Sequence, residues 1–103
     1  MPKVHNQFMN DIPEHIASRM FPMAQRLNKT IRELGKNDSS FKVEGVNLFL
    51  ADGQGAGQTV YHSHLHVIPR FKGDGFKFDI KYPEKKSDEE NDKLASALRD
   101  HLV

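Results

Sequence analysis

The sequence has no cysteine, no long apolar run and almost no net charge. Without cysteine, disulfide bonds and thiolate zinc sites are excluded, which agrees with the cytoplasmic location that we expect. The apolar runs are far too short to cross a bilayer, so we expect no membrane partner. The 15 Lys and Arg residues are nearly balanced by 14 Asp and Glu residues, so the overall electrostatic field predicts no nucleic-acid partner. Any site for an anion must therefore be local.

The length of 103 residues predicts one small domain over 1–103, with 83–103 forming a tail and a helix. Apolar residues at helical spacing predict a first helix that Asp11 caps and Gly35 ends. Pro22 falls inside this pattern, so we expect a kink or two abutting helices near Phe21. Near the end of the chain, the capping-box pattern from Ser87 to Glu90 and an apolar stripe predict a last helix.

Two apolar segments predict an antiparallel hairpin. Alternation over 41–50 changes parity at Glu44 and Gly45, where a turn or bulge would redirect the strand. A second strand is predicted over 59–68, and the glycine-rich connector 51–57 is short enough to join the two. A turn over 71–75 precedes residues 76–82, whose alternation favours a half-buried strand over a nucleic-acid-binding tail.

Three of the six histidines occupy alternate positions in the second predicted strand. On a strand, His62, His64 and His66 would point to the same side. The intervening Tyr61, Leu65 and Val67 would pack on the other face, with Ser63 an exception. Since a buried imidazole needs partners for its nitrogens, we expect chemistry at this row of histidines.

Two kinds of chemistry fit such a row. A His-x-His pair with His5 and an acid could bind zinc or another divalent ion, although three successive same-face histidines of a regular strand are too widely spaced for one zinc ion. Alternatively, the central imidazole could attack phosphorus while its neighbours orient it and bind the phosphate, and this reaction requires no metal. Backbone N–H groups of the glycine-rich loop, Gln58 and Thr59 would then stabilise the developing charge. A third interpretation is that all three histidines have only a structural role, on the surface or hydrogen-bonded in the core.

The segment from Ala56 to Arg70 resembles the signature of the histidine triad (HIT) proteins, His-x-His-x-His with an Ala-Gly-Gln lead-in and two apolar residues after it. The stretch Pro2-Lys3-Val4-His5 similarly resembles the Pro-Lys-x-His of that family. The resemblance implies an α+β fold, an antiparallel sheet with a long helix packed on it, here N-terminally truncated and followed by a C-terminal helix. It also implies a homodimer that hydrolyses or transfers nucleotidyl groups from phosphoramidates or dinucleoside polyphosphates.

Carried over by position, the resemblance makes His64 the nucleophile that takes the nucleotidyl group and places His66 on the phosphate. His62 and His5 would support the nucleophile. The resemblance further assigns the substrate contacts to Gly57, Gln58 and Thr59.

The chain also departs from the family pattern. Ala51 stands where a polar phosphate or ribose contact is usual, and Ser63 where an apolar residue is usual. The strand-helix-strand portion that normally precedes Pro-Lys-x-His and lines the nucleoside pocket is absent from this sequence. We therefore expect either a fragment or a sheet completed by a partner chain, with tight, strand-swapped self-association as one form.

Overall fold

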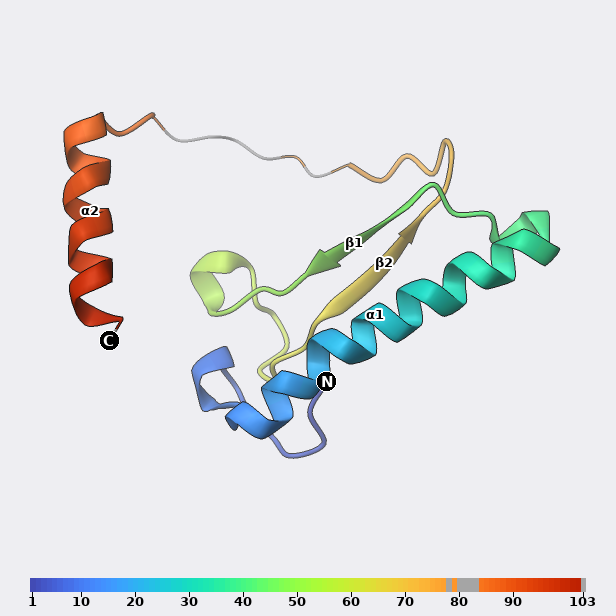
Figure 1. The fold of residues 1–103 in the computed structure, drawn as a ribbon, viewed down its shortest axis with the longest axis horizontal. Helices are drawn as coiled ribbons and strands as arrows, with labels where there is room; N and C mark the ends of the chain where they lie inside the picture. Colours follow the sequence, from blue (N-terminus) through green and yellow to red (C-terminus); the bar gives the residue numbers. More distant parts are fainter. Residues whose placement is uncertain (78, 80–83, 103) are drawn as a thin grey trace.

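The computed structural model describes residues 1–77, 79 and 84–102. Its main elements are helix α1 (Glu14–Asn37), an antiparallel hairpin of β1 (Gly45–Phe49) and β2 (His66–Arg70), and helix α2 (Asp88–His101). Three short 3-10 helices, η1 (Met9–Asp11), η2 (Ser39–Phe41) and η3 (Gln54–Ala56), lie in the connections. Helix α1 runs along the hairpin and α2 lies apart from both (Figure 1). The predicted α+β class, with a long helix beside an antiparallel sheet, is confirmed.

Helix α1 follows the predicted apolar spacing but differs in detail. The prediction of two helices is wrong, because α1 continues through Pro22. An interior proline costs about 3 kcal/mol, but packing of an apolar face contributes most of a helix's stability in proteins. The predicted cap is also wrong: Pro13 holds the N-cap position, while Asp11 belongs to η1 and its carboxylate accepts from the Phe8 N–H at 3.4 Å.

Gly35 does not end α1, which continues to Asn37. A Cβ atom at Gly35 would lie 2.7 Å from the Phe41 carbonyl oxygen, so this glycine allows the chain after the helix to pass close to it. Asp38 shapes that passage by accepting from the Ser40 hydroxyl and N–H. These hydrogen bonds stabilise the carboxylate and lower the pKa of Asp38.

The hairpin register places the two faces of the sheet. Gly45 pairs with Arg70 and Phe49 with His66. Val46 and Leu48 line a cavity with residues of α1, so this parity faces the helix. The opposite parity, which includes Phe49 and His66, therefore lies on the side away from α1.

Strand β2 begins later than the sequence predicts. The prediction of a strand over 59–68 is wrong for its first part, since β2 begins at His66. The partner strand ends at Phe49, opposite His66, so the residues before His66 lie outside the ladder and bond elsewhere. Strand β1 begins at Gly45, where the parity changes, because Ser39–Phe41 form η2. The predicted strand over 76–82 falls largely outside the described residues, and neither Phe76, Lys77 nor Asp79 belongs to a strand.

The turn predicted over 71–75 follows β2 and is held by a charged cluster around Arg70 and Asp74. The Asp74 N–H donates to the Phe71 carbonyl at 3.2 Å. The Arg70 guanidinium donates to the Asp74 carboxylate at 2.9 Å and to Asn47 Oδ1 at 2.9 Å, and it lies over the Phe76 ring. The hydrogen bond from Arg70 is the main cause that lowers the pKa of Asp74 well below its usual range.

The predicted last helix is confirmed as α2. The Ser87 hydroxyl caps it by accepting from the Glu90 N–H at 3.2 Å. Its apolar stripe is open, with Leu94 51% and Leu98 54% exposed. Among the described residues, no helix combines the length and apolar character needed to cross a membrane.

Candidate active site

The site forms where two non-repetitive segments meet. We call residues 2–7 the N-terminal segment and residues 58–65 the histidine loop. The Ser63 N–H donates to the Asn6 carbonyl at 2.6 Å, and the Gln58 side chain donates to the Gln7 carbonyl at 2.8 Å. These bonds replace the ladder that a longer strand would have supplied. They bring together His5 and His62, which are 57 residues apart in sequence.

His62 engages both of its ring nitrogens. Nε2 lies 2.8 Å from the Pro2 carbonyl and Nδ1 lies 3.2 Å from Nδ1 of His5. A carbonyl oxygen accepts but never donates, so neutral His62 carries its hydrogen on Nε2. Nδ1 of His62 then accepts from the Nδ1–H of His5. His62 is thus fixed by the N-terminal segment on both sides of its ring.

His64 has one engaged nitrogen and one with an available lone pair. Its Nδ1 lies 2.7 Å from the His62 carbonyl oxygen, so this nitrogen is the donor. In neutral His64, Nε2 therefore holds the lone pair. The His62 backbone thus selects the tautomer of His64 and the direction of its basic nitrogen, which is the arrangement that a nucleophilic imidazole needs.

His66 is the first residue of β2 and is exposed. Its ring meets the His64 ring edge to face, with centroids 4.7 Å apart. The Phe49 ring of β1 lies 5.9 Å from the His66 ring, centroid to centroid. The three histidines do not share one strand as predicted, but His64 and His66 are nevertheless in ring contact.

The residues between the histidines follow the predicted pattern only in part. Leu65 and Val67 line a cavity of about 460 Å³ with α1, as their predicted packing requires. Tyr61 is 56% exposed, so its predicted packing is wrong, because it lies in the histidine loop outside the sheet. Ser63 is 1% exposed and is buried beside the N-terminal segment.

The glycine-rich loop uses several of its N–H groups internally. Gly57 has φ of 88°, a left-handed conformation that glycine adopts without strain. Its N–H donates to the Gln54 carbonyl at 3.0 Å, and the N–H groups of Ala56 and Gln58 both donate to the Gly53 carbonyl at 3.1 Å. These groups close the loop on itself. Thr59, which follows, is exposed.

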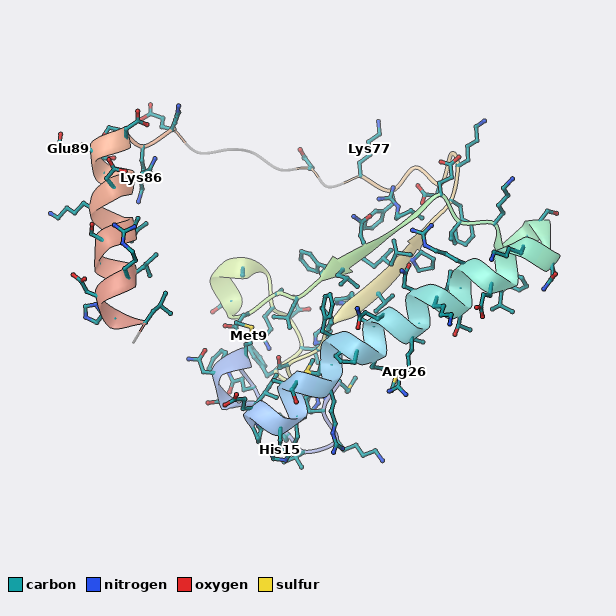
Figure 2. All side chains as sticks on the ribbon, in the orientation of Figure 1. Met9, His15, Arg26, Lys77, Lys86 and Glu89 are labelled. Atoms are coloured by element: carbon teal, nitrogen blue, oxygen red, sulfur yellow. The ribbon has the colours of Figure 1, made fainter. Side chains whose placement is uncertain are left out.

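Sequence reasoning missed several residues that hold the site. The Asp52 carboxylate accepts from the Met9 N–H at 2.7 Å and so anchors the chain just after the N-terminal segment. Figure 2 labels Met9. Asn6 and the Pro2 carbonyl hold the histidine loop. Phe49 lies in the segment predicted as the first strand, but the register that places it opposite His66 was not predicted. The other contacts join non-repetitive segments, which carry no periodic pattern.

No group of three or more His, Cys, Asp or Glu side chains within residues 1–77, 79 and 84–102 could hold a metal ion. The metal-binding interpretation therefore gains no support from the described side chains.

Comparison with known proteins agrees with this geometry. A profile described as the HIT domain matches residues 1–73. The chain belongs to the HIT domain family. It is 36% identical over 78 residues to an uncharacterized HIT-like protein of Borreliella burgdorferi, covering 76% of this chain and 53% of that protein.

Two further relatives of this HIT domain chain carry enzyme names. One is the bis(5'-adenosyl)-triphosphatase of Dictyostelium discoideum, 33% identical and covering 88% of this chain and 61% of that protein. The other is an adenosine 5'-monophosphoramidase of Candida albicans, 29% identical and covering 100% of this chain and 66% of that protein.

A solved HIT family protein of Bacillus anthracis superposes with a TM-score of 0.75 at 33% identity, covering 100% of this chain and 70% of that one. The HIT domain chain spans about half the length of several curated relatives, 53%, 49% and 50% for three of them.

Proposed function

We propose that this chain hydrolyses or transfers nucleotidyl groups of nucleoside phosphoramidates or dinucleoside polyphosphates through a nucleotidyl-histidine intermediate. One observation carries the proposal: the His64 Nδ1–H donates to the His62 carbonyl, which leaves Nε2 as the base. The names of two relatives, a bis(5'-adenosyl)-triphosphatase and an adenosine 5'-monophosphoramidase, support the substrate class.

The proposed reaction has two displacements. His64 Nε2 attacks the α-phosphorus and forms an N–P bond, while the bond from phosphorus to the leaving group breaks and the leaving group takes up a proton. Water or another acceptor then attacks the same phosphorus, the N–P bond breaks, and the nucleotide is released. No metal is required for either step, because the imidazole supplies the nucleophile.

The neighbouring side chains have supporting roles in this proposal. His66, in ring contact with His64 and exposed, would donate to a phosphate oxygen as negative charge develops. Thr59 is exposed and would contact the phosphate or the leaving group. Gly57 and Gln58 have no direct substrate contact in this proposal, because their N–H groups and the Gln58 side-chain amide are engaged inside the fold.

Self-association as a homodimer belongs to the same proposal. In the part of the chain that the structure describes, the sheet has two strands. Large apolar side chains on α1 and β1 are exposed, among them Phe21, Leu34 and Leu48. A second copy covering these side chains would remove apolar surface from water. Equilibrium sedimentation tests this part, and a monomer at all accessible concentrations contradicts it.

The decisive assay measures AMP release from diadenosine triphosphate and adenosine phosphoramidate. We expect turnover by the parent chain and by His15→Asn, whose histidine is exposed on α1 (Figure 2), and none by His64→Asn. Equal turnover by His64→Asn would contradict the proposal. Stoichiometric binding of zinc without turnover would favour the metal-binding alternative. Binding of a nucleotide without turnover would favour a non-catalytic nucleotide-binding protein.

A further inference from the structure

Gln58 is buried at the junction of three segments. It is 3% exposed, although glutamine is a residue that usually remains in water. Its Oε1 accepts from the Gly53 N–H at 2.8 Å. Its Nε2 donates to the Gln7 carbonyl at 2.8 Å and to the Val60 carbonyl at 3.1 Å.

These bonds use both side-chain donors. A glutamine amide has two N–H donors on Nε2 and one carbonyl oxygen. Both donors of Gln58 bond to backbone carbonyls, and a substrate oxygen could gain one only by breaking such a bond. A buried carbonyl oxygen that loses its hydrogen-bond donor, with no water to replace it, is destabilising. Direct recognition of a phosphate by this side chain is therefore unfavourable in the observed fold.

Two of the three partners of Gln58 lie close in sequence to histidines of the site. Gln7 follows His5 by two residues, and Val60 precedes His62 by two residues. His5 and His62 are hydrogen-bonded to each other, and the His62 carbonyl holds the tautomer of His64. A displacement of the backbone at Gln7 or Val60 would thus move the group that orients His64.

We propose that Gln58 is a positioning residue for nucleotidyl transfer: its amide ties the glycine-rich loop to the N-terminal segment and the histidine loop, and thereby keeps His64 Nε2 aimed at the phosphorus. This inference rests on the proposed function. It assigns Gln58 a role different from the substrate contact that the resemblance implies.

The first test uses the unmodified chain, labelled with ¹⁵N, and AMP as the probe. A positioning amide keeps its hydrogen bonds, so the Gln58 side-chain N–H signals should shift little and exchange slowly with water with or without AMP. The histidine ring signals should shift more. If the Gln58 amide signals show the largest shift on AMP addition, Gln58 contacts the ligand and the proposal is wrong.

The second test compares Gln58→Met and Gln58→Glu with Gln25→Met, a matched change at an exposed position of α1. Both Gln58 variants lose the two N–H donors, and Gln58→Glu keeps an acceptor for Gly53. We expect ¹⁵N spectra without substrate to show His64 losing its Nδ1–H preference in either variant that folds. Formation of the nucleotidyl adduct should slow by about 10- to 100-fold, to a similar extent for both substrates.

The outcomes separate the two proposals. The positioning role would be overturned if a Gln58 variant formed the adduct more slowly while its His64 tautomer stayed unchanged. It would also be overturned if the rate fell for only one of the two substrates. An unmodified chain that forms no adduct, while its Gln58 variants change the tautomer, would contradict the proposed function. The control of the His64 tautomer by Gln58 would nevertheless be supported. Gln25→Met should match the parent in both readouts.

Discussion

Removing the His5 side chain should slow nucleotidyl transfer only modestly. In the His5→Ala variant, Nδ1 of His62 loses its donor but Nε2 still donates to the Pro2 carbonyl. The loss is one hydrogen bond between neutral groups, at the exposed side of the pair. Such a bond contributes about 0.5 to 1.5 kcal/mol, which corresponds to a roughly two- to twelvefold lower rate if it acts fully on the transition state.

The assay is the rate of adduct formation in a single turnover at neutral pH, with His5→Asn as the matched variant. An asparagine side-chain N–H could replace the imidazole donor, so His5→Asn should recover most of the lost rate. A loss above about 100-fold in His5→Ala would refute this reasoning, because it would mean that His5 itself moves a proton. Equal losses in both variants would show that the hydrogen bond to His62 is not what matters.

Three further predictions concern stability. Gly35→Ala should destabilise the chain in urea unfolding, because overpacking against Phe41 costs about 1 to 3 kcal/mol and the higher helix propensity of alanine offsets about 1 kcal/mol of this. A peptide of residues 14–37, which lacks Phe41, should instead gain helicity. A variant chain more stable than the parent would contradict the close contact. The Asp74 carboxylate, with its pKa lowered in the folded state, stabilises the fold above the ordinary range of aspartate and loses this contribution on acidification. The stability difference between the parent and Asp74→Asn should therefore be present at neutral pH and shrink below about pH 4. A difference that stays constant with pH would argue against the Arg70 pairing. Ser63→Ala should change the free energy of unfolding by less than about 1 kcal/mol, or stabilise, since the buried Ser63 hydroxyl has no protein partner among the described residues; a larger loss in calorimetry would reveal one.

The helices and the hairpin, which have periodic sequence patterns, could be predicted from the sequence. The contacts between non-repetitive segments could not. The spacing of apolar residues predicted α1 and α2, and alternation predicted an antiparallel hairpin, but it did not predict the register that places Phe49 opposite His66. Local rules misjudged Gly35, because what requires a glycine there is the carbonyl of Phe41, six residues later. Pro22 misled for a similar reason, since packing decides whether a helix continues.

The histidines illustrate the same limit at the site. Alternate spacing correctly singled out His62, His64 and His66 as neighbours, but it assigned them to a strand whose partner ends too early. Their arrangement depends on the N-terminal segment, through Pro2 and His5, and no periodic signal links residues so far apart. The resemblance to HIT proteins assigned His5 a role beside the nucleophile, because it rests on a motif rather than on a period.

The central claim is that His64 Nε2 becomes bonded to phosphorus. The most direct measurement mixes the chain with adenosine phosphoramidate, quenches within one turnover without acid, digests with a protease and maps the added adenylyl mass by tandem mass spectrometry. We predict the adduct on His64, labile to acid and missing in His64→Asn. An adduct on His62 or His66 in the parent, or AMP formed by His64→Asn at the parent's rate, would contradict the claim.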